Sequence, residues 1–331
     1  MESKREKEGK PRKSKGLEDL FGHYELCNQA EGKSLDTTDW YRYIFNQFTT
    51  FLKNHHHSLT LSSFNIDMGR AYVLYLRQRP RFQGHPYTTK QGIISTETVR
   101  GHVRGLRAFS SWLYEEGYTR ENKLKNLKPP KAPLKYKEPL SPEEIDTAAC
   151  CVKQNKFTGI RDHVIYMMAL DNGLRASELA DIELARLNLK EGHVRVMGKG
   201  SKERIVPIGE YVRNLILYYI SQVRPQPADH GCDKLFLSPK GKPITTNTIK
   251  LMFSRLAKKS GINRLHAHLC RYTFAVNYLL NGGDIYALQE ILGHTTLEMV
   301  RHYLHFTSSQ ILAQHHKYSP IDKLYGKGKE K

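Results

Sequence analysis

The chain has 331 residues, of which 39% are hydrophobic and 26% are charged, as is ordinary for a globular protein. Its 52 Lys and Arg against 33 Asp and Glu give a formal net charge of +19, which favours a polyanionic partner, nucleic acid first and an anionic membrane surface second. No apolar run approaches the roughly 20 residues that span a bilayer, and the N-terminus lacks an apolar signal core. We therefore expect a cytoplasmic protein with no membrane partner.

The positive charge is spread along the chain. Residues 1–138 hold 25 Lys and Arg against 15 Asp and Glu, and residues 139–331 hold 27 against 18. Two basic domains that grip one polyanion would give this split, whereas a single basic tail would not. The five cysteines form no CxxC pair, which argues against a disulfide framework and a structural zinc site. Three consecutive histidines also rarely chelate one ion, so we expect no metal at His55, His56 and His57.

A basic, largely disordered tail is predicted over residues 1–33, since residues 1–16 contain no apolar residue after Met1. A helical domain is expected over residues 34–124. Its first helix is indicated by apolar residues at steps of three and four that begin near Thr37: Trp40, Ile44, Phe48, and Phe51 or Leu52.

A second helix is predicted over residues 67–79, followed by a loop over 80–94. The best helix of this half starts at Ser95 or Thr96, either of which can cap it. Its apolar stripe consists of Val99, Val103, Leu106, Phe109 and Leu113. Its other face carries Arg100, Arg104 and Arg107. Such arginines usually form a solvated face, but in a chain this basic we expect them to contact DNA phosphates.

An extended linker is predicted over residues 125–139, because its sequence KNLKPPKAPLKYKEP holds four prolines and five lysines. Lys131 and Lys135 are expected to contact DNA. Ser141 and Glu144 then form a capping box, with a proline at the first helical position. A second domain is therefore expected over residues 140–306, followed by a C-terminal segment over 307–331.

The second domain is predicted to be mostly helical with one small sheet. Residues 160–170 form a buried helix that ends at an Asn-Gly pair, and residues 193–208 read as a β-hairpin around a Gly-Lys-Gly-Ser turn. Further helices are expected over residues 210–222, 246–260, 269–281, 284–293 and 296–305. The fold class is therefore mainly α, with a small antiparallel β-hairpin or sheet in the second domain.

Several polar residues of this domain stand in unusual places. Arg175 follows a helix-ending glycine, and Glu178 follows three residues later. Lys199 lies at the tip of the hairpin, and His268 and Arg271, three apart, share one face of a helix. Tyr303 follows His294 by nine residues, a half-turn out of phase on a straight helix, so a break near Thr295 is needed for both to face one site.

Phosphoryl transfer is the chemistry that these side chains suit. Two arginines can clamp the non-bridging oxygens of a phosphodiester and stabilise the charge on a pentacoordinate phosphorus. A tyrosine that attacks phosphorus must lose its proton, which an imidazole can accept, and the departing 5′ oxygen needs a proton, which a lysine can supply. With this positive charge, neither a metal ion nor another cofactor is needed.

The set resembles the tyrosine recombinase, or phage integrase, family, which includes integrases of mobile elements and Xer-like recombinases. The family carries an ordered Arg, Lys, His-x-x-Arg, His, Tyr set. The matching residues are Arg175 in GLRASEL, Lys199 in GKGSKER, His268 and Arg271 in HLCR, His294 in LGH, and Tyr303 in HYLHF. The first half of the chain resembles the family's helical, SAM-like core-binding domain, particularly in the stretch STETVRGHVRGLRAFSSWLYEEGY over residues 95–118. One departure is Tyr272, where the family often has histidine.

The resemblance implies a two-domain clamp around double-stranded DNA and a site-specific recombinase. Strands would be cleaved through a 3′-phosphotyrosine intermediate and exchanged through a Holliday junction by a tetramer on two DNA sites, most simply for integration or excision of a mobile element. C-terminal segments such as 307–331 pass between neighbouring protomers in the family. An accessory DNA-bending or directionality protein is a further partner that the resemblance allows.

Alternatives stay open for both residues and function. Tyr272 is the rival nucleophile, and Lys202 is the rival of Lys199; Lys202 and Arg204 are otherwise expected to contact DNA. Glu178 is expected to orient an arginine or cap a helix. The chain could instead cut and reseal DNA without partner exchange, like a type IB topoisomerase or a telomere resolvase. It could also be a non-catalytic DNA-binding protein on the same fold.

Overall fold

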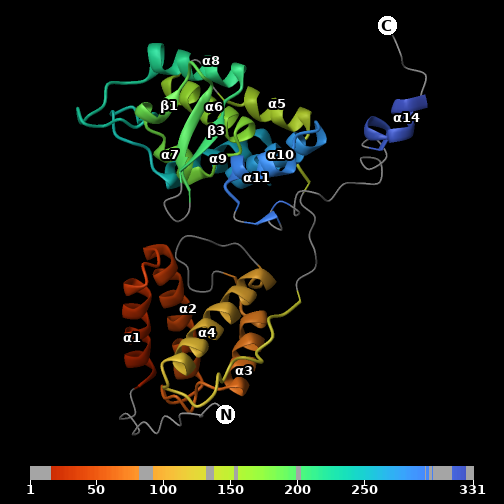
Figure 1. Ribbon diagram of the computed structural model, residues 1–331. Coiled ribbons are helices and arrows are strands. Elements are labelled where there is room, and N and C mark those ends of the chain that lie inside the picture. Colours follow the sequence, from red (N-terminus) through yellow and green to blue (C-terminus); the bar gives the residue numbers. More distant parts are fainter. Residues whose placement is uncertain are drawn as a thin grey trace, which may run out of the picture. The chain divides into compact units, whose positions relative to one another are not determined.

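The computed structural model describes residues 16–81, 92–131, 138–152, 156–198, 203–294, 296–297, 300 and 315–325. The chain divides into two compact units, Met1–Lys135 and Tyr136–Lys331 (Figure 1). The division falls inside the linker predicted over 125–139. Within the described ranges, no helix is both long enough and apolar enough to pass through a bilayer.

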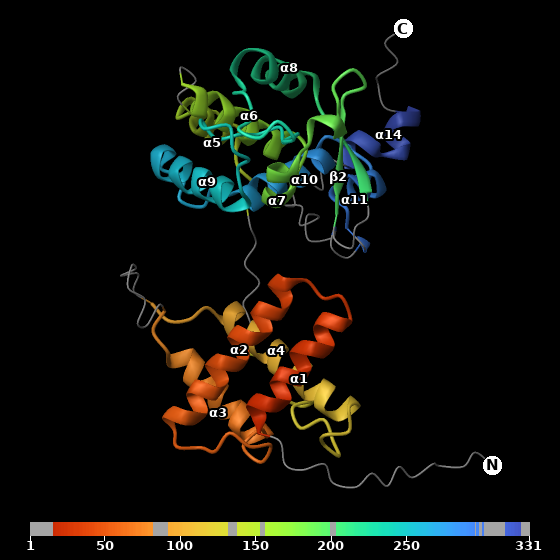
Figure 2. The ribbon, with the colours of Figure 1, turned by 90° about the vertical axis from the view of Figure 1, so that its left-hand side faces the viewer.

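In its described residues the first unit comprises helices α1 to α4 (Figure 2), and the core between them is rich in aromatic side chains. Phe48, Phe64, Tyr72 and Phe109 are each at most 2% exposed, and their rings meet mostly edge to face, the geometry that aromatic quadrupoles prefer. The helices are α1 (Leu17–Ala30), α2 (Leu35–Asn54), α3 (Ile66–Gln78) and α4 (Thr96–Glu115).

Helix α1 corrects the prediction that residues 1–33 form a largely disordered tail. Leu17, Leu20, Phe21 and Tyr24 recur at steps of one, three and four, and each is at most 5% exposed. The Phe21 ring stacks on Phe45 of α2 at 4.0 Å between ring centroids. Charged and polar residues between these four apolar residues lower the local hydrophobicity of the sequence. Their burial therefore becomes clear only from the packing of α1 against α2 and α4.

Helix α4 follows the predicted pattern. The Ser95 side chain caps it by accepting the backbone N–H of Thr98, and the predicted apolar stripe is buried. The chain beyond α4 stays with this unit further than predicted. Leu124 and Leu127 are at most 2% exposed and pack on Gly69 of α3, so the first residues assigned to the linker belong to the first unit.

The second unit is mainly helical with one small antiparallel sheet, as predicted. The sheet has three strands in the order β1-β2-β3, one more than the predicted hairpin. The strands are β1 (Leu187–Asn188), β2 (His193–Met197) and β3 (Glu203–Pro207). The helices are α5 (Pro142–Cys150), α6 (Phe157–Asp171), α7 (Ala176–Asp181), α8 (Glu210–Tyr218), α9 (Thr246–Ser260), α10 (Ala267–Leu280), α11 (Ile285–Leu292) and α14 (Pro320–Tyr325).

The register of the hairpin places apolar side chains on the core. Val194 pairs with Val206, and both are fully buried. Side chains alternate between the faces of a strand, so Arg204, two residues before Val206, lies on this same inward face, whereas Ile205 is 57% exposed. The hairpin tip and most of the helix predicted over 296–305 lie outside the described residues.

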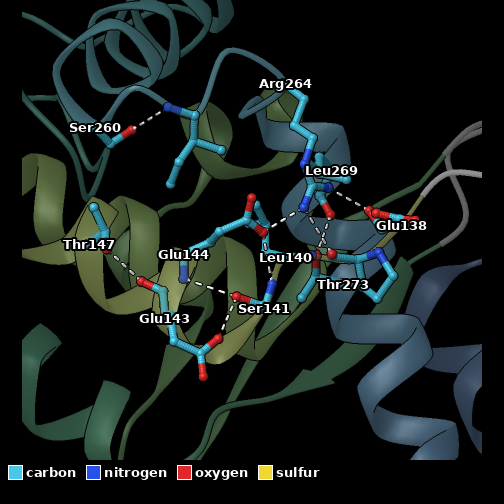
Figure 3. Close-up of polar contacts among 12 residues, drawn as sticks. Glu138, Leu140, Ser141, Glu143, Glu144, Thr147, Ser260, Arg264, Leu269 and Thr273 are labelled. Carbon is cyan, nitrogen blue, oxygen red and sulfur yellow. Dashed lines mark hydrogen bonds and ion pairs between the residues drawn. The ribbon is translucent and has the colours of Figure 1, made fainter.

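The first residues of the second unit, 138–140, are held by hydrogen bonds to α10 and to the loop before it (Figure 3). Arg264, in the loop before α10, donates to the carbonyls of Glu138 and Pro139 and pairs with Glu144. The backbone N–H of Leu140 donates to Thr273 Oγ1 on α10. Glu144 also completes the predicted capping box of α5. These contacts fix the start of α10, the helix that carries His268 and Arg271.

Candidate active site

A glycine turn places Arg175 at the start of helix α7. Gly173 has φ +61°, in the left-handed region that favours glycine, and a Cβ there would lie 2.5 Å from Cδ1 of Phe274. The turn reverses the chain between α6 and α7, so that Arg175 becomes the N-cap of α7. Its side chain is 36% exposed, which leaves part of the guanidinium available to a substrate.

Glu178, in the first turn of α7, is the centre of the site. Its carboxylate is 5% exposed and accepts four hydrogen bonds. The backbone N–H and Nη1 of Arg175 donate to it at 2.9 and 2.7 Å, and the two Nη atoms of Arg204 donate at 2.9 Å each. Burial opposes ionisation of Glu178, but the bonds from Arg204 and Arg175 outweigh it and hold its pKa below the usual range. The carboxylate is therefore an anion that ties two arginines together.

Arg271 of α10 joins the site from the buried side. Its side chain is 1% exposed, and Nη1 lies 4.0 Å from Oε2 of Glu178. Nη1 donates to the carbonyl of Gly173 at 2.7 Å, and Nη2 donates to the carbonyl of Leu292 at 2.7 Å. Arg271 thus connects the turn before α7 with the end of α11, which brings two distant parts of the sequence to one place.

His294 lies against this arginine, directly after α11. Its Nε2 is 3.0 Å from Nη2 of Arg271, and the residue is 9% exposed. Burial, then the charges of Arg271, Arg175 and Arg204, lower the pKa of His294 to about 4, so the ring is neutral at pH 7. Because Arg271 can only donate, Nε2 must accept, and the ring proton is assigned to Nδ1. A neutral imidazole with its proton on Nδ1 can donate to a phosphate oxygen.

His268 stands in the first turn of α10 at an exposed position, and its electrostatic interaction with His294 is the smallest of the effects that lower the pKa of His294. The structure therefore brings together Arg175, Arg271 and His294, and His268 interacts electrostatically with His294. Lys199, Lys202 and Tyr303 lie outside the described residues. Tyr272, the rival nucleophile, is half-buried and packs against the core of the unit. Within the described ranges, no three His, Cys, Asp or Glu side chains gather as a metal site would require.

The buried position of Arg204 was not predicted from the sequence. The residue was expected to contact DNA, but its side chain is 8% exposed and two of its nitrogens bind Glu178. The signal that could have found it is strand alternation, since Arg204 lies two residues before the buried Val206.

The arginines expected to contact DNA lie on α4 in the first unit. Arg100 and Arg104 lie 3.5 and 3.6 Å from Glu97, and Arg104 and Arg107 are exposed. Trp40, which was expected in an apolar stripe, is 38% exposed and lines a pocket with Arg104 and other residues. In the linker, Lys131 is exposed, and Lys135 lies outside the described residues.

Comparisons with known proteins agree with this architecture. Residues 139–310 match the model of the phage integrase family. The tyrosine recombinase XerD of Staphylococcus aureus is 30% identical over 307 residues, which cover 92% of this chain and 99% of that protein. The tyrosine recombinase XerC of Staphylococcus epidermidis is 32% identical over 271 residues, which cover 80% and 84% of the two chains.

Among solved structures, the integrase of transposon Tn1549 in complex with transposon right end DNA superposes with a TM-score of 0.68. It is 19% identical and covers 92% of this chain and 99% of its own, so the likeness is one of fold. The family model matches the second unit, and the 30% identity to XerD extends over 92% of this chain. Both findings agree with the arginine and histidine cluster of the second unit. This chain belongs to the phage integrase family of tyrosine recombinases.

Proposed function

We propose that this chain is a site-specific DNA recombinase, which cleaves and rejoins DNA strands through a covalent bond between Tyr303 and a 3′ phosphate. The observation that carries the proposal is the cluster of Arg175, Arg271 and His294 around Glu178. It concentrates positive charge and hydrogen-bond donors at one place, and the charge that develops on phosphorus during displacement needs both.

The two arginines differ in their access to a phosphate. Arg175 is 36% exposed and uses one side-chain nitrogen on Glu178, so it can meet a non-bridging oxygen directly. Arg271 is 1% exposed, so its contact with a phosphate requires the groups that cover it to move. His294, neutral with its proton on Nδ1, can donate to a phosphate oxygen, but the residue is 9% exposed, so this contact also requires the groups that cover it to move.

The proposed reaction is a displacement at phosphorus that is coupled to two proton transfers. The Tyr303 hydroxyl attacks phosphorus and its proton passes to His268, while the bond from phosphorus to the 5′ oxygen breaks and Lys199 protonates that oxygen. Rejoining reverses these transfers, with a 5′ hydroxyl as the nucleophile. No redox step occurs, and the positive side chains supply the charge stabilisation.

Four protomers on two double-stranded DNA sites would exchange strands through a Holliday junction. Contacts to DNA phosphates are assigned to Arg100, Arg104, Arg107, Lys131, Lys135 and Lys202. Helix α14 supports exchange of the C-terminal segment 307–331 between protomers, because Ile321 and Leu324 on it are 62% and 70% exposed. Integration or excision of a mobile element is the outcome that we propose for this exchange. An accessory DNA-bending or directionality protein would select the direction.

The first test is a covalent trap. The protein is expressed in cells that carry the DNA flanking its own gene, the lysate is denatured without protease, and attached DNA is sequenced beside a Tyr303→Phe control. We expect specific fragments attached to the wild type and none to Y303F, because the phenyl ring has no nucleophilic oxygen.

Each other outcome points elsewhere. Equal attachment to both proteins would reject Tyr303 and direct the same test to Tyr272. Binding without attachment would favour a non-catalytic DNA-binding protein. Attachment without recombinant product, when two sites are supplied, would favour cutting and resealing in the manner of a type IB topoisomerase or a telomere resolvase.

A further inference from the structure

Arg204 connects the two halves of the candidate site without facing the substrate. Its side chain reaches from strand β3 to α7 on one side and to the end of α11 on the other. We infer that Arg204 is a positioning residue that sets Arg175 through Glu178 and sets His294 through the turn that precedes it. The inference deepens the proposed function and rests on it, because positioning matters there only if the site acts on a phosphate.

The first connection passes through Glu178. Nη1 and Nη2 of Arg204 donate to Oε1 and Oε2 of Glu178 at 2.9 Å each, a paired contact that fixes the plane of the carboxylate. The same two oxygens also accept hydrogen bonds from Nη1 and from the backbone N–H of Arg175. The direction of the Arg175 guanidinium is therefore set by a carboxylate that Arg204 holds.

The second connection passes through the end of α11. The last carbonyls of a helix have no partner within it, and Arg204 Nε donates to that of Ile291 at 2.8 Å, beside the bond from Arg271 to Leu292. Gly293 follows with φ +63°, and a Cβ there would lie 3.0 Å from Cδ of Arg204. The arginine thus lies flat on the glycine turn that leads into His294.

The chemistry of arginine explains why lysine would not serve. The planar guanidinium offers N–H groups in fixed directions, so one side chain can bind both carboxylate oxygens and a carbonyl at once. A lysine keeps the charge, but its ammonium is one point that cannot reach all three acceptors. With 8% exposure, Arg204 is also poorly placed to contact DNA itself. Its influence on the reaction must pass through Arg175 and His294.

The test compares Arg204→Lys with Arg161→Lys in the full chain. Arg161 is an equally buried arginine, which pairs with Asp162 and the carbonyl of Leu237 and belongs to no part of the site. Single-turnover covalent attachment is measured on the DNA site recovered by the trap, with a normal scissile phosphate and with a neutral methylphosphonate. The folded fraction of each variant is matched first.

We expect R204K to attach to the normal phosphate on the order of 100-fold more slowly, with unchanged DNA affinity, because a small misplacement of clamping groups costs about that much. The loss should be smaller on the methylphosphonate, since that substrate has less charge for Arg175 to stabilise. R161K should match the wild type on both. An equal loss on both substrates, or weaker DNA binding with a smaller salt dependence, would overturn the inference.

A second measurement does not depend on activity. Hydrogen exchange of the Arg175 guanidinium is followed by nitrogen-15 NMR in the free protein. Exchange should be slow in the wild type and in R161K. It should be fast in R204K, because the Glu178 carboxylate then loses the orientation that Arg204 gives it and binds the Arg175 guanidinium less well. Unchanged exchange in R204K would reject the inference. If the wild type attaches to no DNA, the proposed function fails, while this measurement still decides whether Arg204 positions Arg175.

Discussion

The two units of this protein differ in the burial of their arginine side chains. In the first unit the arginines of α4 stand at the surface over an aromatic core, and two of them pair loosely with Glu97. In the second unit Arg204 and Arg271 are 8% and 1% exposed and converge on one buried carboxylate. The first unit is therefore held by packing, and the second contains charges that depend on one another.

The difference shows where the second unit is vulnerable. A buried charge loses its hydration, and only a partner with good hydrogen bonds offsets the loss. Glu178 is the anion among three arginines, and further donors of Arg204 and Arg271 bind the carbonyls of Gly173, Ile291 and Leu292. Removing one member should cost far more here than removing a surface ion pair elsewhere.

The largest effect is expected for Glu178→Ala. The change leaves Arg204 and Arg271 as buried cations of like charge without their anion, and breaking a buried pair in this way costs about 3–5 kcal/mol. Urea unfolding is followed by hydrogen exchange with mass spectrometry in the second unit. Tryptophan fluorescence follows the first unit in the same sample, because the two tryptophans of the chain, Trp40 and Trp112, both lie there.

Glu183→Ala is the matched control. Glu183 pairs with Lys234 at 3.1 Å and with Arg186 at 2.8 Å, but all three side chains are 28–36% exposed, so its removal should cost only about 1 kcal/mol. The tryptophan transition should be unchanged in both variants. A loss of similar size for E178A and E183A would mean that the buried cluster adds nothing beyond an ordinary surface pair, and the contrast between the units would fail.

A smaller effect, in the first unit, concerns His102. The ring is 3% exposed and its Nδ1 contacts the hydroxyl of Tyr72 at 3.0 Å. Burial, then the charge of Arg79, lowers the pKa of His102 from 6.5 to about 4. Between these pH values the unfolded chain binds a proton that the folded chain does not, so the free energy of unfolding falls as pH falls from 6.5 to 4, by about 3 kcal/mol.

His102→Asn tests that contribution, because an amide can keep the contact with Tyr72 but cannot titrate. The tryptophan-detected free energy of unfolding should depend less steeply on pH between 6.5 and 4 in H102N than in the wild type. His57→Asn, at an exposed position of the same unit, serves as the control and should leave the wild-type pH dependence in place. An unaltered slope in H102N would show that another group carries the acid sensitivity of the first unit.

The same contrast separates what the sequence could predict from what it could not. Residues within one motif were placed well, because a local pattern determines them: Ser95 caps α4, and the alternating residues of 193–208 form the hairpin. The ordered set Arg175, Arg271 and His294 indicated a shared site, and these three residues do meet.

The failures have tertiary causes. Helix α1 is a weak amphipathic segment whose burial depends on α2 and α4, and its charged neighbours suggested a tail. Strand β1 has two residues, too few for any alternation, and exists because β2 lies beside it. Arg204 was expected to contact DNA, but acceptors on α7 and α11, which its strand sequence does not reveal, stabilise its guanidinium in a buried position.

The smallest effect on stability is expected for Arg104→Ala on α4. Its side chain is 68% exposed and lies 3.6 Å from Glu97, so the free energy of unfolding should change by less than about 1 kcal/mol. If Arg104 neutralises one phosphate, the slope of log binding constant against log salt should become shallower by about 0.9 on duplex DNA, whatever the sequence. Arg70→Ala, an equally exposed arginine paired with Asp67 on α3, should leave that slope unchanged. Equal slopes for both variants would mean that Arg104 contacts no phosphate and that the arginine face of α4 is simply exposed to solvent.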